Sequence, residues 1–351
     1  MDWFERLTGF RETGYEGTRC QLEVQGTQLR SRVNGKSYGI GALELVSLAE
    51  LRQRVQSAGS LPGRLTVRVV SGDVRRLHQA PEYAGALFQV ASQFNLLEMV
   101  SPNVTPEQGV TRYAGDPTQG PACAIAAGAA TIYRNYFAPV GAKVGQTRER
   151  QLDGLAPLGA ALAEGTGLRV DALWRMRNGY ALCTRTGLIA ISGYLASLDE
   201  TVIDRLRGAL CIGLHHDVEV TDGPLDVATS TPAVTTGTRP TVSQAFCSAL
   251  PLGYSEDRTP ALSRPFATLV LEAAYEATLC AALARAQAGG SRKVLLTSLG
   301  GGVFSNDEAW IIAAMERALR LFEDRAFDVR VVSYREPSEK LSRMVATFDT
   351  R

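Results

Sequence analysis

Residues 294–308 read VLLTSLGGGVFSNDE, a short apolar run that stops at three consecutive glycines and leads directly into a helix pattern. A strand, a glycine loop and a helix start in this order form a phosphate cradle in α/β proteins, because glycines let the backbone approach an anion. Unpaired amides of such a loop point inward, and the helix N-terminus adds positive potential. Asn306 or Asp307 is suited to cap the helix. The stretch therefore predicts an α/β fold with an anion site, and the alternative is a tight connecting loop without a ligand.

Length and composition exclude several classes of protein. The 351 residues suffice for one large domain or two ordinary ones. A formal net charge of +1 gives no electrostatic argument for nucleic acid or a membrane as a partner. No apolar run reaches the roughly 20 residues of a membrane span, and the N-terminus lacks the basic start and apolar core of a signal peptide. Six scattered cysteines without a CxxC pair indicate reduced thiols, so we expect a cytoplasmic protein.

Strand and helix patterns alternate along the chain. Residues 1–61 are predicted to form a β-rich extension, with a hairpin signal at Asn34-Gly35 and helical spacing over residues 45–55. Beyond it, strands are expected at residues 65–70, 87–92, 210–220, 244–250, 294–300 and 328–334, and helices at 121–137, 269–288 and after residue 302. Residues 62–351 then form one domain with an insertion near 141–210, and residues 223–240 form an exposed loop. The alternation predicts a three-layer α/β/α sandwich with a mixed, largely parallel sheet, which binds ligands at the carboxyl ends of its strands.

Polar and glycine-rich segments follow several of these strands. They are Gly72-Asp73-Val74, Asn95, the stretch from Gly120 to Gly128 that opens an alanine-rich helix, and Gly302-Val303-Phe304. In this order and spacing the segments resemble the macrodomain family, whose members bind ADP-ribose in an α/β/α fold. The resemblance covers about residues 62–335, with insertions.

The resemblance implies ligand-binding roles. Asp73, beside Val74, would accept a hydrogen bond from the adenine amine, and Asn95 would bond the hydroxyls of the distal ribose. The diphosphate and the distal ribose would be contacted by Gly300, Gly301, Gly302, Val303 and Phe304. The alternatives are an ordinary turn aspartate, an Asx turn and a phenylalanine that packs in the core.

One segment departs from the binding-only members of the family. Residues 98–119 form a longer and more polar loop than their glycine run. Poly(ADP-ribose) glycohydrolases also remodel this loop and place acidic catalytic residues at the start of the following helix, but this chain has no Gln-Glu-Glu there. The departure argues against cutting of poly(ADP-ribose). It resembles instead a divergent glycohydrolase branch, similar to bacterial effector macrodomains that remove ADP-ribose from arginine.

The same loop offers Glu98, Glu107, Asp116 and Gln119 as candidates for catalysis. Cleavage of a glycosidic bond passes through an oxocarbenium-like state, which a nearby carboxylate stabilises while it activates water. We predict Asp116 as the first catalytic residue, Glu107 as a partner that orients water or the leaving group, and Gln119 as a ribose-positioning residue. The alternative is that all three are solvated loop residues. The scheme needs no cofactor and no metal.

The pair His215-His216 is the remaining candidate for a metal or catalytic site. Adjacent strand residues point to opposite faces, so the two side chains cannot converge. His216 shares a face with apolar residues and is predicted as a core histidine, whereas His215 would face the cleft. A zinc site needs three or four converging ligands, so no metal site is predicted.

These features predict an ADP-ribosyl hydrolase that removes ADP-ribose from a mono-ADP-ribosylated protein, with arginine as one linkage. The carboxylates of the loop favour catalysis, and the extension and the insertion favour a protein substrate. The alternatives are a non-catalytic reader of ADP-ribose and a hydrolase of O-acetyl-ADP-ribose or a related nucleotide. The expected partner is ADP-ribose or an ADP-ribosylated protein, with neither nucleic acid nor a membrane.

Overall fold

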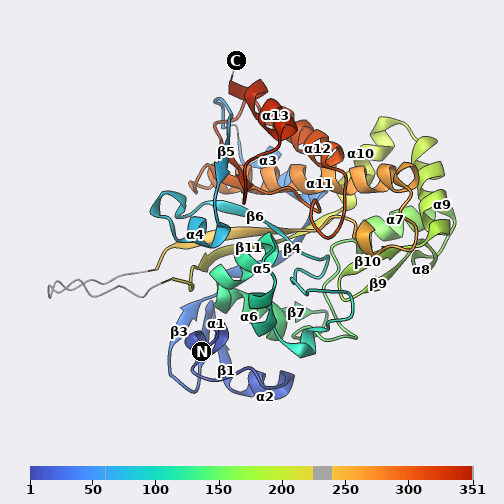
Figure 1. Cartoon of the computed structure of the whole chain (residues 1–351). Helices are drawn as coiled ribbons and strands as arrows, with labels where there is room; N and C mark the ends of the chain where they lie inside the picture. The colour runs from blue at the N-terminus through green and yellow to red at the C-terminus, as the bar shows by residue number, and fades with distance from the viewer. Residues whose placement is uncertain (60, 224–238, 350–351) are drawn as a thin grey trace.

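A seven-stranded central sheet organises the chain. The computed structural model describes residues 1–59, 61–223 and 239–349 (Figure 1). The strands follow the order β4 (Ala42–Ser47), β11 (Cys211–Glu219), β12 (Thr241–Cys247), β6 (Leu87–Ala91), β13 (Lys293–Leu296), β14 (Asp328–Ser333) and β5 (Thr66–Ser71). Strand β11 is antiparallel to both of its neighbours, and the other neighbouring pairs are parallel. The predicted mixed and largely parallel sheet is therefore confirmed.

Helices cover both faces of the sheet, which gives the predicted three layers (Figure 1). One face carries α3 (Leu48–Ser57), α10 (Glu200–Ala209), α11 (Pro260–Gln287), α12 (Glu308–Leu321) and α13 (Glu339–Asp349). The other face carries α4 (Val74–Gln79), α5 (Gln119–Ala126) and α6 (Gly128–Tyr136). The helix predicted over residues 121–137 is thus two helices, because Ala127 has a non-helical backbone with φ −111° and ψ 57°.

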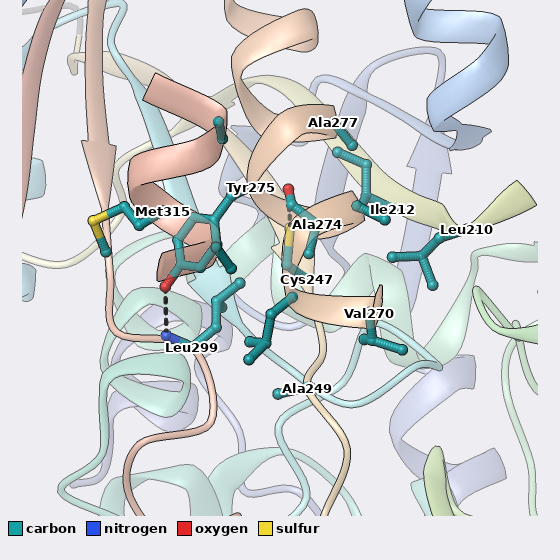
Figure 2. Packing of buried hydrophobic residues seen from close by; sticks show 14 of the residues in the cluster. Leu210, Ile212, Cys247, Ala249, Val270, Ala274, Tyr275, Ala277, Leu299 and Met315 are labelled. Atoms are coloured by element: carbon teal, nitrogen blue, oxygen red, sulfur yellow. Dashed lines mark hydrogen bonds between the residues drawn. The ribbon is translucent and has the colours of Figure 1, made fainter. Parts of the chain in front are cut away.

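The long helix α11 is the centre of the larger core. It is apolar and long enough to cross a membrane, but 89% of its most apolar window is buried inside the protein, as in a core helix. Its Tyr275 donates a hydrogen bond to the carbonyl of Thr297 at 2.7 Å and accepts one from the amide of Leu299 at 3.0 Å. Figure 2 shows the hydrogen bond between Tyr275 and Leu299 among the apolar side chains of the core. Helix α11 therefore anchors the segment between β13 and the glycine loop.

The N-terminal part is smaller than predicted. It contains α1 (Trp3–Thr8), α2 (Tyr15–Cys20), β1 (Leu22–Gln25), β2 (Gln28–Ser31) and β3 (Ser37–Gly39). The three strands pair antiparallel, and the turn at Asn34-Gly35 joins β2 to β3 as predicted. The predicted boundary at residue 61 is wrong, because β4 pairs with β11 in the central sheet and α3 packs against α11. Long-range pairing, which a local pattern does not report, draws both elements into the main domain.

The insertion near residues 141–210 is helical with two short hairpins, the first of which begins just before it. It contains β8 (Lys143–Val144), which pairs with β7 (Pro139–Val140), then α7 (Ala156–Thr166), α8 (Val170–Leu173), β9 (Trp174–Arg177), β10 (Tyr180–Cys183), α9 (Arg185–Ala196) and α10. Strands β9 and β10 pair antiparallel, and the hairpin lies beside the turn at Leu252–Tyr254 that follows β12. The hairpin thereby reaches the carboxyl ends of the central strands. The loop predicted at residues 223–240 lies mostly outside the described residues.

Candidate functional site

A cavity of about 300 Å³ lies at the carboxyl ends of β6, β12 and β13. Four segments line it: the loop after β6 with Ser92, Gln93 and Glu98, the start of α5 with Asp116 and Gln119, the glycine loop with Gly300, Gly302, Val303 and Phe304, and Tyr180 of the insertion. Ligands of open α/β sheets bind at this edge of the sheet. The segment that begins at Gly120 and the glycine loop therefore meet at this edge of the sheet.

A second cavity of about 430 Å³ adjoins the first. It is lined by the end of β5 and the start of α4, including Asp73, Val74 and Arg75. The two cavities share six lining residues: Asp116, Pro117, Gln119, Thr297, Ser298 and Tyr334. Together they form one elongated cleft, and each volume lies within or near the roughly 300–1,000 Å³ typical of small-molecule sites.

The glycine loop has the form expected of an anion cradle. Gly300 has φ 73°, and a Cβ at this position would lie 2.5 Å from the Cβ of Ala249, so only glycine fits. The Asn306 amide donates to the Gly300 carbonyl at 3.0 Å, which closes the loop. Among the described residues, the backbone amides of Gly302 and Val303 have no hydrogen-bond partner. These amides are free to bind an anion.

Gly301 differs from its neighbours in the loop. It does not line either cavity, and a Cβ there would lie 3.3 Å from Ile311 of α12. The predicted contact of Gly301 with a ligand therefore has no support from the geometry, and its role is to let the loop pack on α12.

Of the two residues predicted to cap α12, Asp307 does so. Its carboxylate accepts a hydrogen bond from the Ala309 amide at 2.7 Å.

Asp73 and Val74, to which the resemblance assigned the adenine, line the second cavity. Asp73 caps α4, and its Oδ1 accepts a hydrogen bond from the Arg75 amide at 2.9 Å. Arg75 in turn forms an ion pair with Asp222 at 2.7 Å. The carboxylate of Asp73 is thus held by its own helix start, lines the cavity and forms no ion pair with any residue that the structure describes.

Asp116 and Gln119 lie where the two cavities join. The Oδ1 atom of Asp116 accepts hydrogen bonds from the amide and the hydroxyl of Thr118, at 2.9 and 2.6 Å. Gln119 uses both ends of its amide to hold β6, because Oε1 accepts from the Ala91 amide at 2.9 Å and Nε2 donates to the Gln89 carbonyl at 2.8 Å. The other carboxylate oxygen of Asp116 has no hydrogen-bond partner within the described part of the chain, whereas Gln119 fixes the start of α5 against the strand.

Besides Gly301, two predicted site residues lie outside both cavities. Asn95 is fully buried; its Nδ2 donates to Gln151 Oε1 at 2.8 Å, and its Oδ1 accepts from the Leu97 amide at 3.1 Å. This geometry is the Asx turn considered as the alternative. Glu107 accepts a hydrogen bond from the Arg148 amide at 2.8 Å, so its carboxylate holds the insertion. The structure therefore gives no support to a ribose contact by Asn95 or a catalytic role for Glu107.

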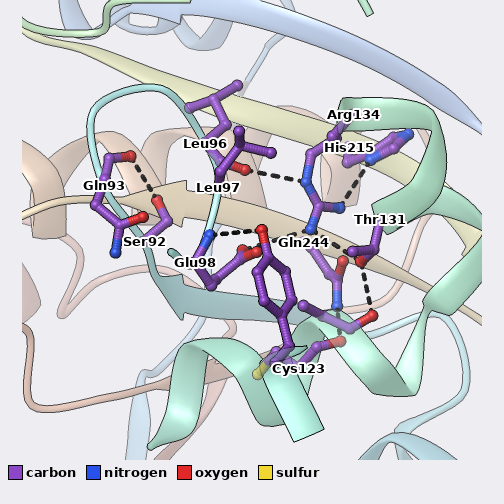
Figure 3. Close-up of polar contacts among 12 residues, drawn as sticks. Ser92, Gln93, Leu96, Leu97, Glu98, Cys123, Thr131, Arg134, His215 and Gln244 are labelled. Atoms are coloured by element: carbon purple, nitrogen blue, oxygen red, sulfur yellow. Dashed lines mark hydrogen bonds and ion pairs between the residues drawn. The ribbon is translucent and has the colours of Figure 1, made fainter. Parts of the chain in front are cut away.

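Glu98 is the fourth candidate of the loop, beside Glu107, Asp116 and Gln119, and no role was predicted for it from the sequence. Its side chain is 1% exposed and lines the first cavity. Oε1 lies 3.4 Å from Nη2 of Arg134, and Oε2 has no partner among the described residues (Figure 3). Burial raises the pKa of Glu98 to about 7, against the opposing effect of Arg134. A signal was present in the sequence, since the surrounding Leu96-Leu97 and Met99-Val100 are apolar.

Arg134 organises the polar cluster behind Glu98. It is completely buried on α6; Nε donates to the Leu96 carbonyl at 3.1 Å and Nη2 to the Thr131 hydroxyl at 3.0 Å. Its guanidinium lies 3.9 Å from the ring centre of Phe246. These contacts hold the guanidinium on the inner side of Glu98, away from solvent.

His215 belongs to the same cluster, which corrects the sequence prediction. It is fully buried, with Nδ1 3.4 Å from Nη1 of Arg134, whereas the side chain of His216 is 25% exposed and bonds Glu44 at 3.0 Å. Burial, helped by Arg134, holds the pKa of His215 well below its usual value, so the imidazole is neutral. His215 is the core histidine, and neither imidazole faces the cleft. Within the described ranges no three His, Cys, Asp or Glu side chains converge as metal ligands.

Aromatic side chains close the first cavity at the end near the insertion. The ring centres of Phe304 and Tyr180 lie 5.4 Å apart, and Tyr254 packs at 6.2 Å from Phe304. The Tyr180 hydroxyl donates to the Met99 carbonyl at 2.5 Å, one residue after Glu98. The insertion therefore supplies a wall of the cavity and supports the loop that carries Glu98, a role that the sequence did not reveal.

Comparisons with known proteins yield only distant similarities. No protein-family model and no curated protein matches the chain. The solved structure of poly(ADP-ribose) glycohydrolase from Deinococcus radiodurans in complex with ADP-ribose is 14% identical, with 88% of this chain and 93% of that chain covered and a TM-score of 0.43. The enzyme of the same name from Thermomonospora curvata is 14% identical, with 95% and 94% covered and a TM-score of 0.42. At this distance the function has to be argued from the cleft itself.

Proposed function

We propose that the protein hydrolyses the glycosidic bond that joins ADP-ribose to an acceptor. The observation that carries this proposal is the elongated cleft, which has the Asp73 carboxylate in one cavity and a glycine loop beside the buried carboxyl of Glu98 in the other. A nucleoside diphosphate sugar has the matching sequence of groups: an amine-bearing base, a diphosphate and a sugar with a reactive carbon.

Each part of the cleft suits one part of that ligand. The carboxylate of Asp73 can accept a hydrogen bond from the adenine amine, and the free amides of Gly302 and Val303 can bind the diphosphate. The aromatic wall of Phe304 and Tyr180 offers an apolar surface to the distal ribose. A diphosphate bound at the loop would bring the distal ribose to the side of the cavity that carries Glu98.

The carboxyl groups favour hydrolysis over binding alone. A pure reader needs no buried acid, whereas cleavage through an oxocarbenium-like state uses one. The substrate that we propose is a mono-ADP-ribosylated protein, because the insertion, which supplies Tyr180 to the cavity wall, adds surface beside a cleft that is already sufficient for ADP-ribose. The two similar solved structures are named poly(ADP-ribose) glycohydrolases, so the polymer belongs in the test as well.

The test is release of free ADP-ribose, followed by chromatography, from four substrates: proteins mono-ADP-ribosylated on arginine, glutamate or serine, and poly(ADP-ribose). We expect release from at least one mono-ADP-ribosylated protein. Release from poly(ADP-ribose) alone would support the hydrolase activity but contradict a mono-ADP-ribosylated protein as the substrate. Binding of ADP-ribose without release from any substrate would make the protein a reader and contradict hydrolysis.

A further inference from the structure

We propose that Glu98 is the general acid of this reaction and donates its proton to the acceptor atom of the glycosidic bond. The proposal rests on the proposed hydrolase function. It places the acid on the loop after β6, whereas the carboxylate predicted from the sequence, that of Asp116, lies just before α5.

Position 120, at the start of α5, has no room for an acidic side chain. A Cβ at Gly120 would lie 1.9 Å from the carbonyl oxygen of Ala91 and 3.2 Å from Cγ of Glu98. The space into which a side chain at this position would point is therefore filled by the end of β6 and by Glu98.

The two oxygens of Glu98 differ in their surroundings. Oε1 contacts Nη2 of Arg134 at 3.4 Å, and the backbone amide of Glu98 donates to the Tyr113 hydroxyl at 3.1 Å. Oε2 has no hydrogen-bond partner among the described residues, although the side chain lines the cavity. A buried carboxyl oxygen without a partner is costly when it is charged and is less so when it carries a proton. The geometry therefore points to Oε2 as the atom that holds the proton in the free protein.

The charged and titratable groups around Glu98 are compatible with this proton. Arg134 faces it from α6, Tyr113 from the turn at Thr111–Gly115 and Cys123 from α5, with the neutral His215 behind Arg134 on β11. Burial of the carboxyl outweighs the attraction of Arg134 and raises its pKa to about 7. An acid with a pKa near the working pH is well matched to proton transfer.

The step balances without a cofactor. The C1–acceptor bond of the distal ribose breaks, its electron pair leaves with the acceptor, and the proton of Glu98 Oε2 moves to that acceptor atom. Water then attacks the oxocarbenium-like carbon and gives one proton to the Glu98 carboxylate, which restores the acid. The products are free ADP-ribose and the unmodified acceptor. Asp116, at the junction of the cavities, is placed to stabilise the positive charge with its free oxygen.

The experiment compares the full-length wild type with Glu98→Gln, Glu98→Asp and a matched control, Glu276→Gln. Glu276 is also a buried glutamate that pairs with arginines, Arg52 and Arg317, but it lies on α11 outside both cavities. The measurements are kcat on the best mono-ADP-ribosylated protein, its dependence on pH, the Kd of ADP-ribose by calorimetry and the melting temperature.

Glu98→Gln is expected to lower kcat by about 10²–10⁴-fold, the usual contribution of a general acid, while the Kd changes by less than about threefold. Wild-type kcat should fall about tenfold per pH unit above pH 7, and this fall should disappear from the residual activity of Glu98→Gln. Glu98→Asp, which withdraws the carboxyl by one methylene, should lose kcat and keep a fall with pH. Glu276→Gln should lose stability but retain kcat.

Different results separate the two proposals. No release of ADP-ribose by the wild type from any substrate would overturn the hydrolase itself. An active wild type beside a folded Glu98→Gln that keeps kcat within about threefold would overturn the role of Glu98 alone. If Glu98→Gln does not fold, Glu98→Asp and the pH dependence of the wild-type kcat test the role of Glu98 instead. Full activity of Glu98→Asp together with a kcat that does not change above pH 7 would also overturn that role.

Discussion

Nη2 of Arg134 lies 3.4 Å from Oε1 of Glu98, while Oε2 of the same carboxyl has no partner among the described residues. The arginine has further partners in Leu96 and Thr131, so its charge is better satisfied than that of the glutamate. In a buried pair with this imbalance the arginine stays charged. The pKa of the carboxyl, which burial raises to about 7, leaves it partly protonated near neutral pH.

The first prediction concerns the stability of the fold as a function of pH. The folded pKa of Glu98 is raised to about 7, whereas its unfolded value is about 4.3. Folding therefore favours the protonated form, and the stabilisation present below about pH 4 is lost as the pH rises through about 7. The free energy of unfolding of the wild type, relative to Glu98→Gln, should decline on the order of 3 kcal/mol between pH 4 and pH 8.

Urea unfolding of both proteins at several pH values measures this difference. The variant is a necessary reference, because burial lowers the pKa of His78 to about 4 and that of His215 well below its usual value. Both histidines change stability in the opposite direction, and they do so in the wild type and in the variant. A difference that does not vary with pH would contradict the raised pKa of Glu98.

The second prediction concerns Arg134. Arg134→Met leaves Glu98 buried without its cation and removes the donors to Leu96 and Thr131, so it should lower the free energy of unfolding by about 3–5 kcal/mol. Arg112→Met is the control, because Arg112 is exposed and should change stability by less than about 0.5 kcal/mol. Denaturant unfolding measures the free energy of unfolding of both variants. Equal losses in the two variants would contradict a stabilising role of the buried cluster around Arg134.

The third prediction concerns the glycine loop. In Gly300→Ala the new methyl group meets the Ala249 Cβ at 2.5 Å on a backbone with φ 73°, so the loop has to move. We expect the Kd of ADP-ribose to rise by at least about tenfold, or about 1.4 kcal/mol. Gly193→Ala in α9, where nothing lies within 4 Å, should leave the Kd unchanged and stabilise the helix by up to about 1 kcal/mol. Unchanged binding by Gly300→Ala would argue against the loop as the anion site.

The fourth prediction concerns Tyr334 at the junction of the two cavities. Its side chain is 76% exposed, and it lines both cavities, a position in which an aromatic ring contacts a ligand rather than the core. Tyr334→Ala should weaken ADP-ribose binding by about tenfold with little change in melting temperature. Leu321→Ala, an exposed apolar residue of α12, is the control. Equal Kd values for wild type and Tyr334→Ala in a calorimetric titration would remove Tyr334 from the site.

Local patterns predicted most of the fold. Six of the seven central strands and the glycine loop follow from apolar runs and turn residues, which depend only on neighbours in the sequence. Strand β4 was not predicted from the local pattern. It lies between a hairpin and a helix, and its pairing with β11 joins residues more than 150 positions apart in the chain. The residues over 45–55 were expected to be helical, and the helix α3 begins at Leu48, immediately after that strand.

The site was harder to predict than the fold. The alternation of residues along the strand predicted that His216 lies in the core. Helices cover both faces of the central sheet, so apolar neighbours do not show which of the two histidines is the more deeply buried. A register shift between His215 and Val218, with Asp217 at φ 52°, further breaks the alternation. The apolar neighbours of Glu98 set it apart from Glu107 in the sequence, but only the fold shows that Glu98 lines the cavity while Glu107 accepts a hydrogen bond from the Arg148 amide. Likewise, the contact of Tyr180 with Phe304 joins segments far apart in the chain.

The most direct test of the account is a calorimetric titration of ADP-ribose into the wild-type protein. The cleft predicts saturable binding of one ligand per chain, with a Kd on the order of micromolar or about −8 kcal/mol. Absence of a binding heat at millimolar ADP-ribose would contradict the assignment of the cleft, and with it the hydrolase and the role of Glu98.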